Sequence, residues 1–490
     1  MTAVEEGRSR AGGGEASATS AGVLPRSPRR RNARGSKRPA HQRSDRLHRV
    51  AFTTSRLAEF CGKRELIAQT GHAIDDWPLV ILKELVDNAL DACEEAEIAP
   101  EIDIEVSTKT GEIAIADNGP GIPAETVRDV VDYSSRVSSR EAYTSPTRGA
   151  QGNALKTLVA MPFALDGQCG TTVIEAKGIR HTIIFRVDQL RQSPAIDHQT
   201  VPLVAPRKGT RICITWPQSA SSILAGSGSH FLQIADDFGW LNPHLRVRVE
   251  WNGAERVNRE PSAPAWEKWR VCDPTSAHWY DLARLERYIA AHVSRDQDLG
   301  RDRTVREFIS ELRGFSGSAK QKLVLDETGL TRSSLASLFA PGGEPKKDEI
   351  EALLGALKRH SKPVKPQHLG LIGRDHLLAR FKEVGVEPET FKYQKALGEI
   401  EGLPWVVETA FGWCPSLKSR RIIVGVNWSV GLGNPFRSFS RNGGEGLDAL
   451  LANQRAGRDE PVIFILHYAC PRAAYTDRGK SAIILPEGRQ

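Results

Sequence analysis

Two side chains that could do chemistry together, Glu84 and Asn88, lie four residues apart in a stretch with the apolar spacing of a helix. A helix that carries both on one turn could hold a general base and a metal ligand over a shared site. Glutamate and asparagine at this spacing also occur on many solvated helix faces, so the pair alone leaves both interpretations open. Asp87 and Asp91, beside them, are interpreted as residues that solvate or cap the helix. Another stripe of the same helix is apolar and comprises Leu82, Leu85, Val86, Ala89 and Cys93.

Three further motifs follow this helix along the chain. A strand-like run, Glu112–Ala116, leads into the segment Asp117–Gly121, which on its own could be an ordinary turn. A glycine-rich segment, Arg148–Ala154, opens a second helical pattern, and Gly209-Thr210 opens a strand. The chain contains neither a G-x-x-x-x-G-K-[ST] phosphate loop nor a dinucleotide fingerprint.

The four motifs, in this order, resemble the ATP-binding domain of the gyrase, heat-shock chaperone, histidine kinase and MutL superfamily, the GHKL or Bergerat fold. The resemblance implies an α+β sandwich that binds ATP and Mg²⁺. It implies that Glu84 is the general base that orients and deprotonates the attacking water, and that Asn88 is the Mg²⁺ ligand. Asp117 would accept a hydrogen bond from the exocyclic amine of adenine, with the hydroxyl of Thr210 in support.

Glycines complete the expected nucleotide site. Gly119 and Gly121 would let the backbone pass close to the base. Gly149 and Gly152 resemble the glycines of the ATP lid, which we expect over roughly residues 123–147. A glycine-rich loop that runs into a helix N-terminus offers backbone N–H groups to phosphates. The other contacts expected in this loop are Gln151, Asn153 and Ala154.

Other segments narrow the resemblance to the B subunits of type IIB topoisomerases, the topoisomerase VI family. Residues 52–71 are similar to the N-terminal strap of these subunits, and the Asn-Pro-His motif at residues 242–244 is also similar to theirs. The segments Val305–Ile309 and Gly317–Lys322 resemble their helix–two-turn–helix insert, although any small helical domain would also fit.

Lys480 lies in a loop after a strongly apolar strand, Pro461–Tyr468. In the topoisomerase VI family a lysine in this loop is the switch residue that reaches the γ-phosphate from the transducer domain; a solvated surface lysine is the alternative. Two features depart from the family. Residues 152–154 read Gly-Asn-Ala where Gly-Ile-Gly is usual, and the sequence ends ten residues after Lys480, before the long helices that reach the A subunit. We therefore expect the usual connection from the transducer to the A subunit to be missing or supplied otherwise.

The positive charge of the chain is concentrated at its N-terminus. Residues 1–50 contain twelve Lys and Arg against four Asp and Glu, a net charge of +8, whereas the whole chain carries +7, so residues 51–490 sum to −1. This tail is expected to be disordered and could hold DNA phosphates nonspecifically, or could be a solubilising extension. The seven cysteines are scattered without a C-x-x-C motif, which fits a reducing cytoplasm. No run of about 18 apolar residues occurs, so we expect no membrane span.

The patterns predict four regions: a disordered basic tail at 1–50, a GHKL ATPase domain with its strap at 51–260, a helix–two-turn–helix-like domain at 261–360, and a shortened transducer-like domain at 361–490. A helix over Leu447–Asn453 would make a crossover between the last two strands. The expected strands are Ile102–Ser107, Ile113–Ala116, Thr171–Ala176, His181–Val187, Arg211–Trp216, Arg246–Glu250, Trp405–Thr409, Arg421–Trp428 and Pro461–Tyr468.

Together these features predict the ATP-hydrolysing, B-subunit-like component of a topoisomerase VI-like enzyme. ATP binding would drive homodimerisation, with the strap packed on the other protomer, and the dimer would capture and pass a DNA duplex. Because no cleavage tyrosine or toprim-type acidic cluster is recognisable, cutting would belong to a separate, toprim-containing A-like subunit. The expected location is the cytoplasm, at the nucleoid. The alternative is a nucleotide-dependent conformational clamp or scaffold in a DNA-maintenance or defence complex, without strand passage.

Overall fold

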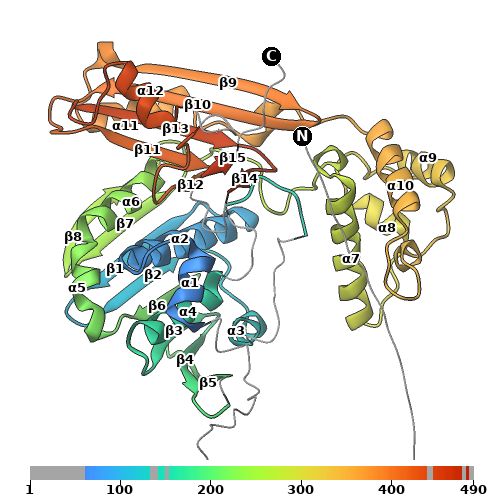
Figure 1. Cartoon of the computed structure of the whole chain (residues 1–490), viewed down its shortest axis with the longest axis horizontal. Coiled ribbons are helices and arrows are strands. Elements are labelled where there is room, and N and C mark those ends of the chain that lie inside the picture. The colour runs from blue at the N-terminus through green and yellow to red at the C-terminus, as the bar shows by residue number, and fades with distance from the viewer. Residues whose placement is uncertain are drawn as a thin grey trace, which may run out of the picture. The chain divides into compact units, whose positions relative to one another are not determined.

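The computed structural model describes residues 61–132, 142–148, 154–191, 193–438, 445–476 and 482–484. In these ranges the chain forms two large sheets with helices packed on them, and a group of helices that separates the two sheets in sequence (Figure 1). The expected basic tail and residues 52–60 of the expected strap lie outside the described ranges. None of the described helices is both long and apolar enough to cross a membrane.

The first sheet has eight strands among the described residues, in the order β5-β4-β3-β6-β2-β1-β7-β8. Its strands pair antiparallel except β1 with β7, which are parallel. Apolar residues alternate along β1, where Ile102, Ile104 and Val106 are buried, so one face of the sheet is apolar. The strands are β1 (Glu101–Ser107), β2 (Glu112–Asp117), β3 (Gly170–Ala176), β4 (Ile179–Asp188), β5 (Ser193–Pro202), β6 (Thr210–Thr215), β7 (Arg246–Trp251) and β8 (Ala254–Arg259).

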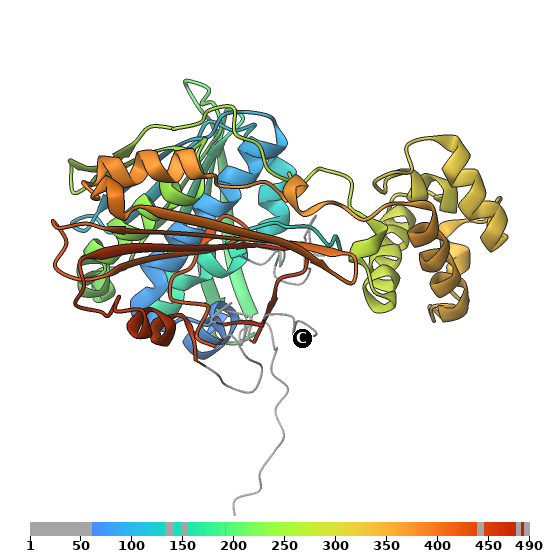
Figure 2. The ribbon, with the colours of Figure 1, turned by 90° about the horizontal axis from the view of Figure 1, so that it is seen from above.

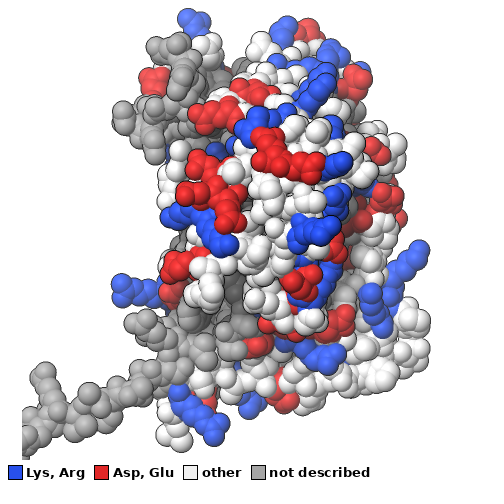
Figure 3. All heavy atoms as spheres, turned by 90° about the vertical axis from the view of Figure 1, so that its right-hand side faces the viewer, with Lys and Arg blue, Asp and Glu red and all other residues white. Residues whose placement is uncertain are grey.

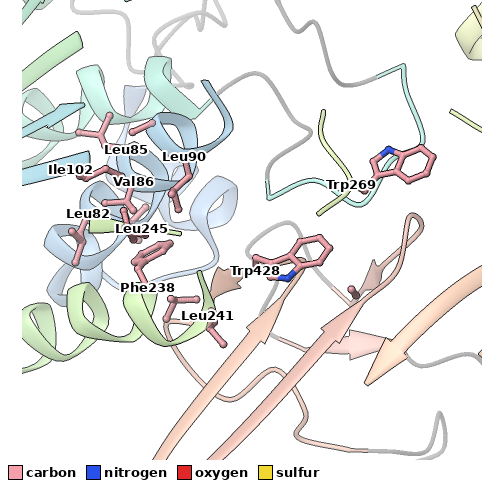
Figure 4. Close-up of a cluster of buried hydrophobic side chains, with 14 of the residues drawn as sticks. Leu82, Leu85, Val86, Leu90, Ile102, Phe238, Leu241, Leu245, Trp269 and Trp428 are labelled. Carbon is pink, nitrogen blue, oxygen red and sulfur yellow. The ribbon is translucent and has the colours of Figure 1, made fainter. Parts of the chain in front are cut away.

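Helices α2, α4 and α6 pack on this sheet, and α1 packs on α4. Helix α2 begins with Trp77-Pro78, and proline suits a first turn because the backbone N–H that it lacks has no partner there. The apolar stripe expected on α2 is buried, and Figure 4 shows α2 side chains beside Phe238 and Leu241 of α6. The helices around this sheet are α1 (Lys63–Thr70), α2 (Trp77–Glu95), α3 (Ala124–Val131), α4 (Ala154–Asp166), α5 (Ser221–Gly226) and α6 (Gly228–Leu241).

A group of helices follows the first sheet in the chain. A capping box starts α8, because the Thr304 hydroxyl accepts from the Glu307 N–H while the Glu307 carboxylate accepts from the Thr304 N–H. Helix α9 ends at Thr328, and Gly329, with a φ of +71°, forms its C-cap. The helices are α7 (Leu282–Asp298), α8 (Val305–Ser310), α9 (Ser318–Thr328) and α10 (Lys347–His360), with 3₁₀ turns at Ala277–Trp279 and Leu335–Leu338.

The second sheet has five strands among the described residues, in the order β12-β11-β13-β10-β9. Strands β11 and β13 are parallel with α12 between them in sequence, as expected for a crossover. Figure 2 shows α11 and α12 on opposite sides of this sheet. The elements are α11 (Arg374–Glu383), β9 (Lys392–Ile400), β10 (Leu403–Trp413), β11 (Arg421–Val426), β12 (Ser429–Val430), α12 (Leu447–Asn453) and β13 (Val462–Ala469), followed by the small β14 (Ala474–Tyr475) and β15 (Ile483–Ile484).

The strand expected over Arg421–Trp428 is wrong at its end. Strand β11 stops at Val426, and Asn427 and Trp428 form a two-residue turn with φ of +51° and +63°, after which Ser429 pairs back with Val426. Positive φ at both central residues is the geometry that matches the twist of a tight hairpin. Strands β5 and β9 were not expected, because both are largely exposed edge strands whose sequences lack the apolar alternation that marks a buried strand.

Candidate nucleotide site

Helix α2 carries Glu84 and Asn88. Glu84 is partly buried, with 27% of its side chain exposed, and Asn88 is exposed. The Lys83 ammonium lies 3.6 Å from Oε1 of Glu84. Although burial alone would lower the pKa of Lys83, the carboxylates of Asp87 and Glu84 raise it above its usual value. An ionised carboxylate can accept hydrogen bonds from water.

Asp117 ends β2 and is held by backbone donors. Its Oδ1 accepts hydrogen bonds from the N–H of Gly119 at 2.8 Å and of Thr210 at 3.1 Å. No described residue donates to Oδ2, so this oxygen can accept from an amino group such as that of adenine. Burial raises the pKa of this carboxyl, while the two N–H donors oppose the shift.

The glycines around Asp117 are required by close packing. A Cβ on Gly209 would lie 1.9 Å from the carbonyl oxygen of Asp117, and the φ of Gly209 is +71°. A Cβ on Gly119 would lie 3.0 Å from Oδ1 of Asp117. Gly121 has a φ of +80° and lies close to the Gly209 carbonyl. Gly209 was not among the expected site residues, although its position directly before Thr210 in the same motif could have identified it.

Thr210 reaches Asp117 differently from the expectation. Its backbone N–H, rather than its hydroxyl, contacts the carboxylate, and its Oγ1 accepts from the N–H of Ile122 at 3.1 Å. The hydroxyl therefore stabilises the turn that follows β2. Cys93, at the end of α2, contacts the same turn, since its Sγ lies 3.4 Å from Oδ1 of Asn118. The helix with Glu84 and the turn with Asp117 are thus adjacent elements of one packed unit.

Mg²⁺ fits the donors that this region offers. The described residues contain no cluster of three or more His, Cys, Asp or Glu side chains that could cage a metal ion. Mg²⁺ in nucleotide sites keeps several waters and takes phosphate oxygens, so a single neutral carboxamide such as exposed Asn88 suits it as a protein ligand.

Several expected contacts fall outside the described residues: Gly149, Gln151, Gly152, Asn153 and Lys480. Ala154 is the first residue of α4, a helix of 13 residues. The loop that contains Lys480 has described ends: the Thr476 N–H donates to the Ala482 carbonyl at 3.0 Å, and the Ile483 N–H donates to the Pro435 carbonyl at 2.8 Å. Tyr475, just before the loop, lies close enough to Lys83 to influence its pKa. Tyr475, the described residue in β14 before the loop, therefore lies near α2.

The interpretation of Asp87 and Asp91 as solvating or capping residues is wrong, because both are buried. Oδ2 of Asp87 accepts from the Lys83 ammonium at 2.7 Å and from the Ser429 hydroxyl at 2.6 Å. Asp91 accepts from Arg148 at 2.7 Å. A buried carboxylate is tolerated only when it is paired and hydrogen-bonded, and the partners here come from distant parts of the chain that a helix pattern does not reveal.

A buried ion cluster lies at the C-terminal end of α2. Arg148, fully buried, donates to both oxygens of Glu94, and Lys268 lies 2.7 Å from the same carboxylate. Burial alone would raise the pKa of Glu94, but Arg148 and Lys268 hold it well below its usual value. The Asn-Pro-His motif belongs to this cluster: Asn242 accepts from Arg148 at 2.6 Å, and His244 lies 3.0 Å from Glu94. In the sequence, the Asn-Pro-His motif and Arg148 were recognised only as parts of family motifs. Their role in a buried ion cluster was not predicted.

A hollow of about 590 Å³ lies elsewhere, between α6, β8 and the start of β11. Its walls include Arg256, Arg259, Arg421 and Asp236, and Arg421 and Arg259 both pair with Asp236. It contains none of the expected nucleotide residues, so it is not the nucleotide site.

Comparisons with known proteins agree with the motifs. Residues 75–220 match the family described as histidine kinase-, DNA gyrase B- and HSP90-like ATPases. The chain is 22% identical to the B subunit of type 2 DNA topoisomerase 6 from Archaeoglobus fulgidus, over 84% of this chain and 67% of that protein. It is 33% identical to the corresponding B subunit from Natronomonas pharaonis, over 39% of this chain and 24% of that protein. For the B subunit from Methanosarcina barkeri the identity is 40%, over 36% of this chain and 29% of that protein.

The aligned regions thus span between 24% and 67% of the length of these relatives. Among solved structures, the ATPase region of Saccharomyces cerevisiae topoisomerase II aligns with 82% of this chain and 76% of its own length. The identity is 11% and the TM-score is 0.37, a similarity too weak to support a conclusion. The α+β architecture and the family match confirm the expected fold class and the resemblance on which it was based.

Proposed function

We propose that this chain, which contains a GHKL-type ATPase domain and resembles the B subunit of type 2 DNA topoisomerase 6, binds and hydrolyses ATP with Mg²⁺. The observation that carries the proposal is the packing of the Asp117 turn against the end of the helix that presents Glu84 and Asn88. One helix and one turn thereby supply an adenine acceptor, a metal ligand and a base.

Asp117 is the proposed adenine reader. Its Oδ1 is occupied by two backbone donors, which fix the carboxylate so that Oδ2 accepts from the exocyclic amine. Gly119, Gly121 and Gly209 leave the space beside it free of Cβ atoms. Guanine carries a carbonyl where adenine carries this amine, so the arrangement favours adenine.

Glu84 is the proposed general base: it accepts a proton from the attacking water while the water oxygen bonds to the γ-phosphorus and ADP leaves. Bound Mg²⁺, held by Asn88 and the phosphates, would neutralise phosphate charge.

Lys480 is the proposed switch residue, and Gly149, Gln151, Gly152, Asn153 and Ala154 are the proposed phosphate contacts. Tyr475, which precedes the Lys480 loop, lies close enough to Lys83 of α2 to influence its pKa, and this supports the assignment.

ATP binding is proposed to bring two copies of the chain together and to serve DNA duplex capture and passage with a separate, DNA-cleaving A-like subunit. The similarity to the B subunits of topoisomerase 6 supports this role. The proposed regions are the basic tail at 1–50, the ATPase domain with its strap at 51–260, the helix–two-turn–helix-like domain at 261–360 and the transducer-like domain at 361–490. On the face that bears helices α7 to α10, basic and acidic side chains are interspersed rather than gathered into one basic strip (Figure 3), so DNA contact is proposed for the assembled dimer rather than for this face alone.

Size-exclusion chromatography with light scattering tests the proposal. The full chain should be a monomer without nucleotide and a dimer with Mg²⁺ and a nonhydrolysable ATP analogue, and it should hydrolyse ATP. A chain that stays monomeric and releases no phosphate would overturn the proposal. A chain that dimerises on ATP but supports no DNA relaxation with its A-like partner would point instead to a nucleotide-dependent clamp or scaffold.

A further inference from the structure

The hollow between α6, β8 and the start of β11 has a basic lining. Its volume of about 590 Å³ lies within the range of roughly 300–1,000 Å³ that is usual for small-molecule sites. Among the described residues that line it, four are arginines and one is a carboxylate: Arg256, Arg259, Arg420, Arg421 and Asp236. Four positive charges and one negative charge give the lining a formal charge of +3. Figure 1 shows α6, β8 and β11 beside one another, so the hollow lies where the first and second sheets meet.

The ion pairs at this hollow are layered, with the carboxylates beneath the guanidinium groups. The side chains of Asp236 and Asp237 are 10% and 3% exposed, whereas those of Arg259 and Arg421 are 25% and 19% exposed. Asp236 accepts hydrogen bonds from Arg259 at 2.5 Å, from Arg421 at 2.8 Å and from the Trp240 indole at 3.2 Å. Because its oxygens are occupied by these donors, the surface that a ligand meets is formed mainly by arginines.

Arg421 is held in place by contacts within the chain. Its Nη2 donates to Asp236 at 2.8 Å and to Asp237 at 2.5 Å, and its guanidinium carbon lies 5.4 Å from the Trp240 ring centroid. Its Nη1 has no hydrogen-bond partner among the described residues. Arg259 is similar, since its Nε and Nη1 contact carboxylates while its Nη2 bonds to no described residue. Fixed guanidinium groups with unused N–H donors can bind an oxyanion with little further loss of side-chain freedom.

Arg256 adds a charge that no described carboxylate pairs with. It is exposed, and it makes no ion pair or side-chain hydrogen bond with the residues that the structure describes. The pairing of β7 with β8 skips it, because Val249 pairs with Val257 and the next residue, Glu250, pairs with Glu255. Arg256 is thus the extra residue of a β-bulge on the edge strand β8. Bulges bend a strand and change the direction of its side chains, often beside functional sites.

Phosphate oxygens are the ligand chemistry that fits this lining. The planar guanidinium fork matches a phosphate group through two parallel N–H···O bonds. A metal cation would be repelled by the basic lining, and an apolar ligand would leave the arginine donors without partners. Arg256, Arg259 and Arg421 together offer more N–H donors than the oxygens of a single carboxylate can accept.

We propose that this hollow is a binding site for phosphate groups, separate from the proposed nucleotide site, and that Arg256, Arg259 and Arg421 supply its donors. The phosphates belong either to a nucleic-acid backbone or to a free polyphosphate. Because α6 and β8 form one wall and the start of β11 forms the other, the bound phosphates would contact both sheets. The proposal does not rest on ATP hydrolysis, since it uses none of the residues assigned to the nucleotide site.

The test compares phosphate binding by the wild type, Arg256→Ala and a matched control, Arg287→Ala. Arg287 is an exposed arginine of α7 that does not line the hollow. All three proteins are full chains, so the basic tail is the same in each. In the first arm, calorimetry follows titration with pyrophosphate in EDTA, which removes the Mg²⁺ that phosphates need at the proposed nucleotide site. In the second arm, fluorescence anisotropy follows binding of a labelled DNA duplex over a range of salt concentrations.

Arg256→Ala should weaken binding about tenfold in at least one arm, because it removes charge-assisted hydrogen bonds, while Arg287→Ala should bind like the wild type. Weaker pyrophosphate binding, with or without weaker DNA binding, would identify a free polyphosphate as the ligand. Weaker DNA binding alone, with a salt dependence reduced by about one phosphate contact, would identify the nucleic-acid backbone.

A second variant, Arg256→Lys, separates loss of a binding group from loss of structure. It keeps the charge but not the planar fork, so it should restore part of the affinity that Arg256→Ala loses. Equal affinities of Arg256→Ala and Arg287→Ala in both arms would overturn the proposal, and so would a loss that Arg256→Lys does not reduce. Failure of the proposed ATPase function would be seen separately, because neither arm contains a nucleoside triphosphate.

Discussion

Replacement of the buried Arg148 by methionine tests whether the ion cluster at the end of α2 stabilises the fold. The Arg148 side chain has no exposed surface and lies 2.7 Å from both Asp91 and Glu94. Removal of one partner from a buried ion pair costs about 3–5 kcal/mol, because the remaining charge stays buried. Glu94 keeps Lys268 at 2.7 Å, so we expect the lower end of that range, about 3 kcal/mol.

The assay is urea unfolding of the full chain followed by tryptophan fluorescence. The control is Arg180→Ala, which breaks an ion pair of similar length, 2.6 Å to Glu175, but with 54% of the arginine side chain exposed. Such a pair contributes about 0–1 kcal/mol. If both variants unfold at the same urea concentration, the stabilising role assigned to the cluster is wrong.

The cluster also predicts a pH dependence. The pKa of Glu94 is held below its usual value of 4.5 in the folded chain, so its contribution to stability is present above that pH. This contribution is lost as the pH falls below about 4.5 and through the lower pKa of the folded state. Below about pH 4.5 the wild type should therefore lose stability more steeply than Arg148→Met, measured by the same unfolding curves. Parallel pH profiles would contradict the lowered pKa.

Three further substitutions address the nucleotide site. Glu84→Ala should bind ATP but hydrolyse it about 100-fold more slowly or worse, and phosphate release near the wild-type rate would refute its role as the base. Asn88→Ala should weaken Mg²⁺-dependent ATP binding by about tenfold in calorimetry, and an unchanged affinity would exclude it as the metal ligand. Gly209→Ala should lower stability by about 1–3 kcal/mol or more and weaken ATP binding, because its Cβ would lie 1.9 Å from the Asp117 carbonyl oxygen; wild-type unfolding would contradict that packing.

The sequence revealed the parts of the site that depend on local patterns. Periodicity placed Glu84 and Asn88 on a helix and predicted its buried stripe, and alternation predicted most strands of both sheets. Asp117 was found because a carboxylate followed by glycines at a strand end is a local signal. Edge strands such as β5 were not predicted, because a solvent-exposed edge strand lacks the apolar alternation on which the prediction depends.

The buried polar contacts could not be predicted in the same way. Asp91 is paired with Arg148, 57 residues away, and Asp87 with Ser429, 342 residues away. On a helical wheel both aspartates fall beside exposed positions, and only the approach of distant elements buries them. The turn at Asn427–Trp428 was missed because a tryptophan with positive φ goes against its own backbone preference and is stabilised by tertiary contacts.

The central claim, that Asp117 and the Glu84 helix form an ATP site, is tested most directly by calorimetric titration of the full chain with Mg-ATP. The account predicts saturable binding of one ATP per chain, loss of that binding in Asp117→Ala, and its retention in Glu84→Ala. Binding of ATP by Asp117→Ala with wild-type affinity, or no binding by the wild type, would contradict it.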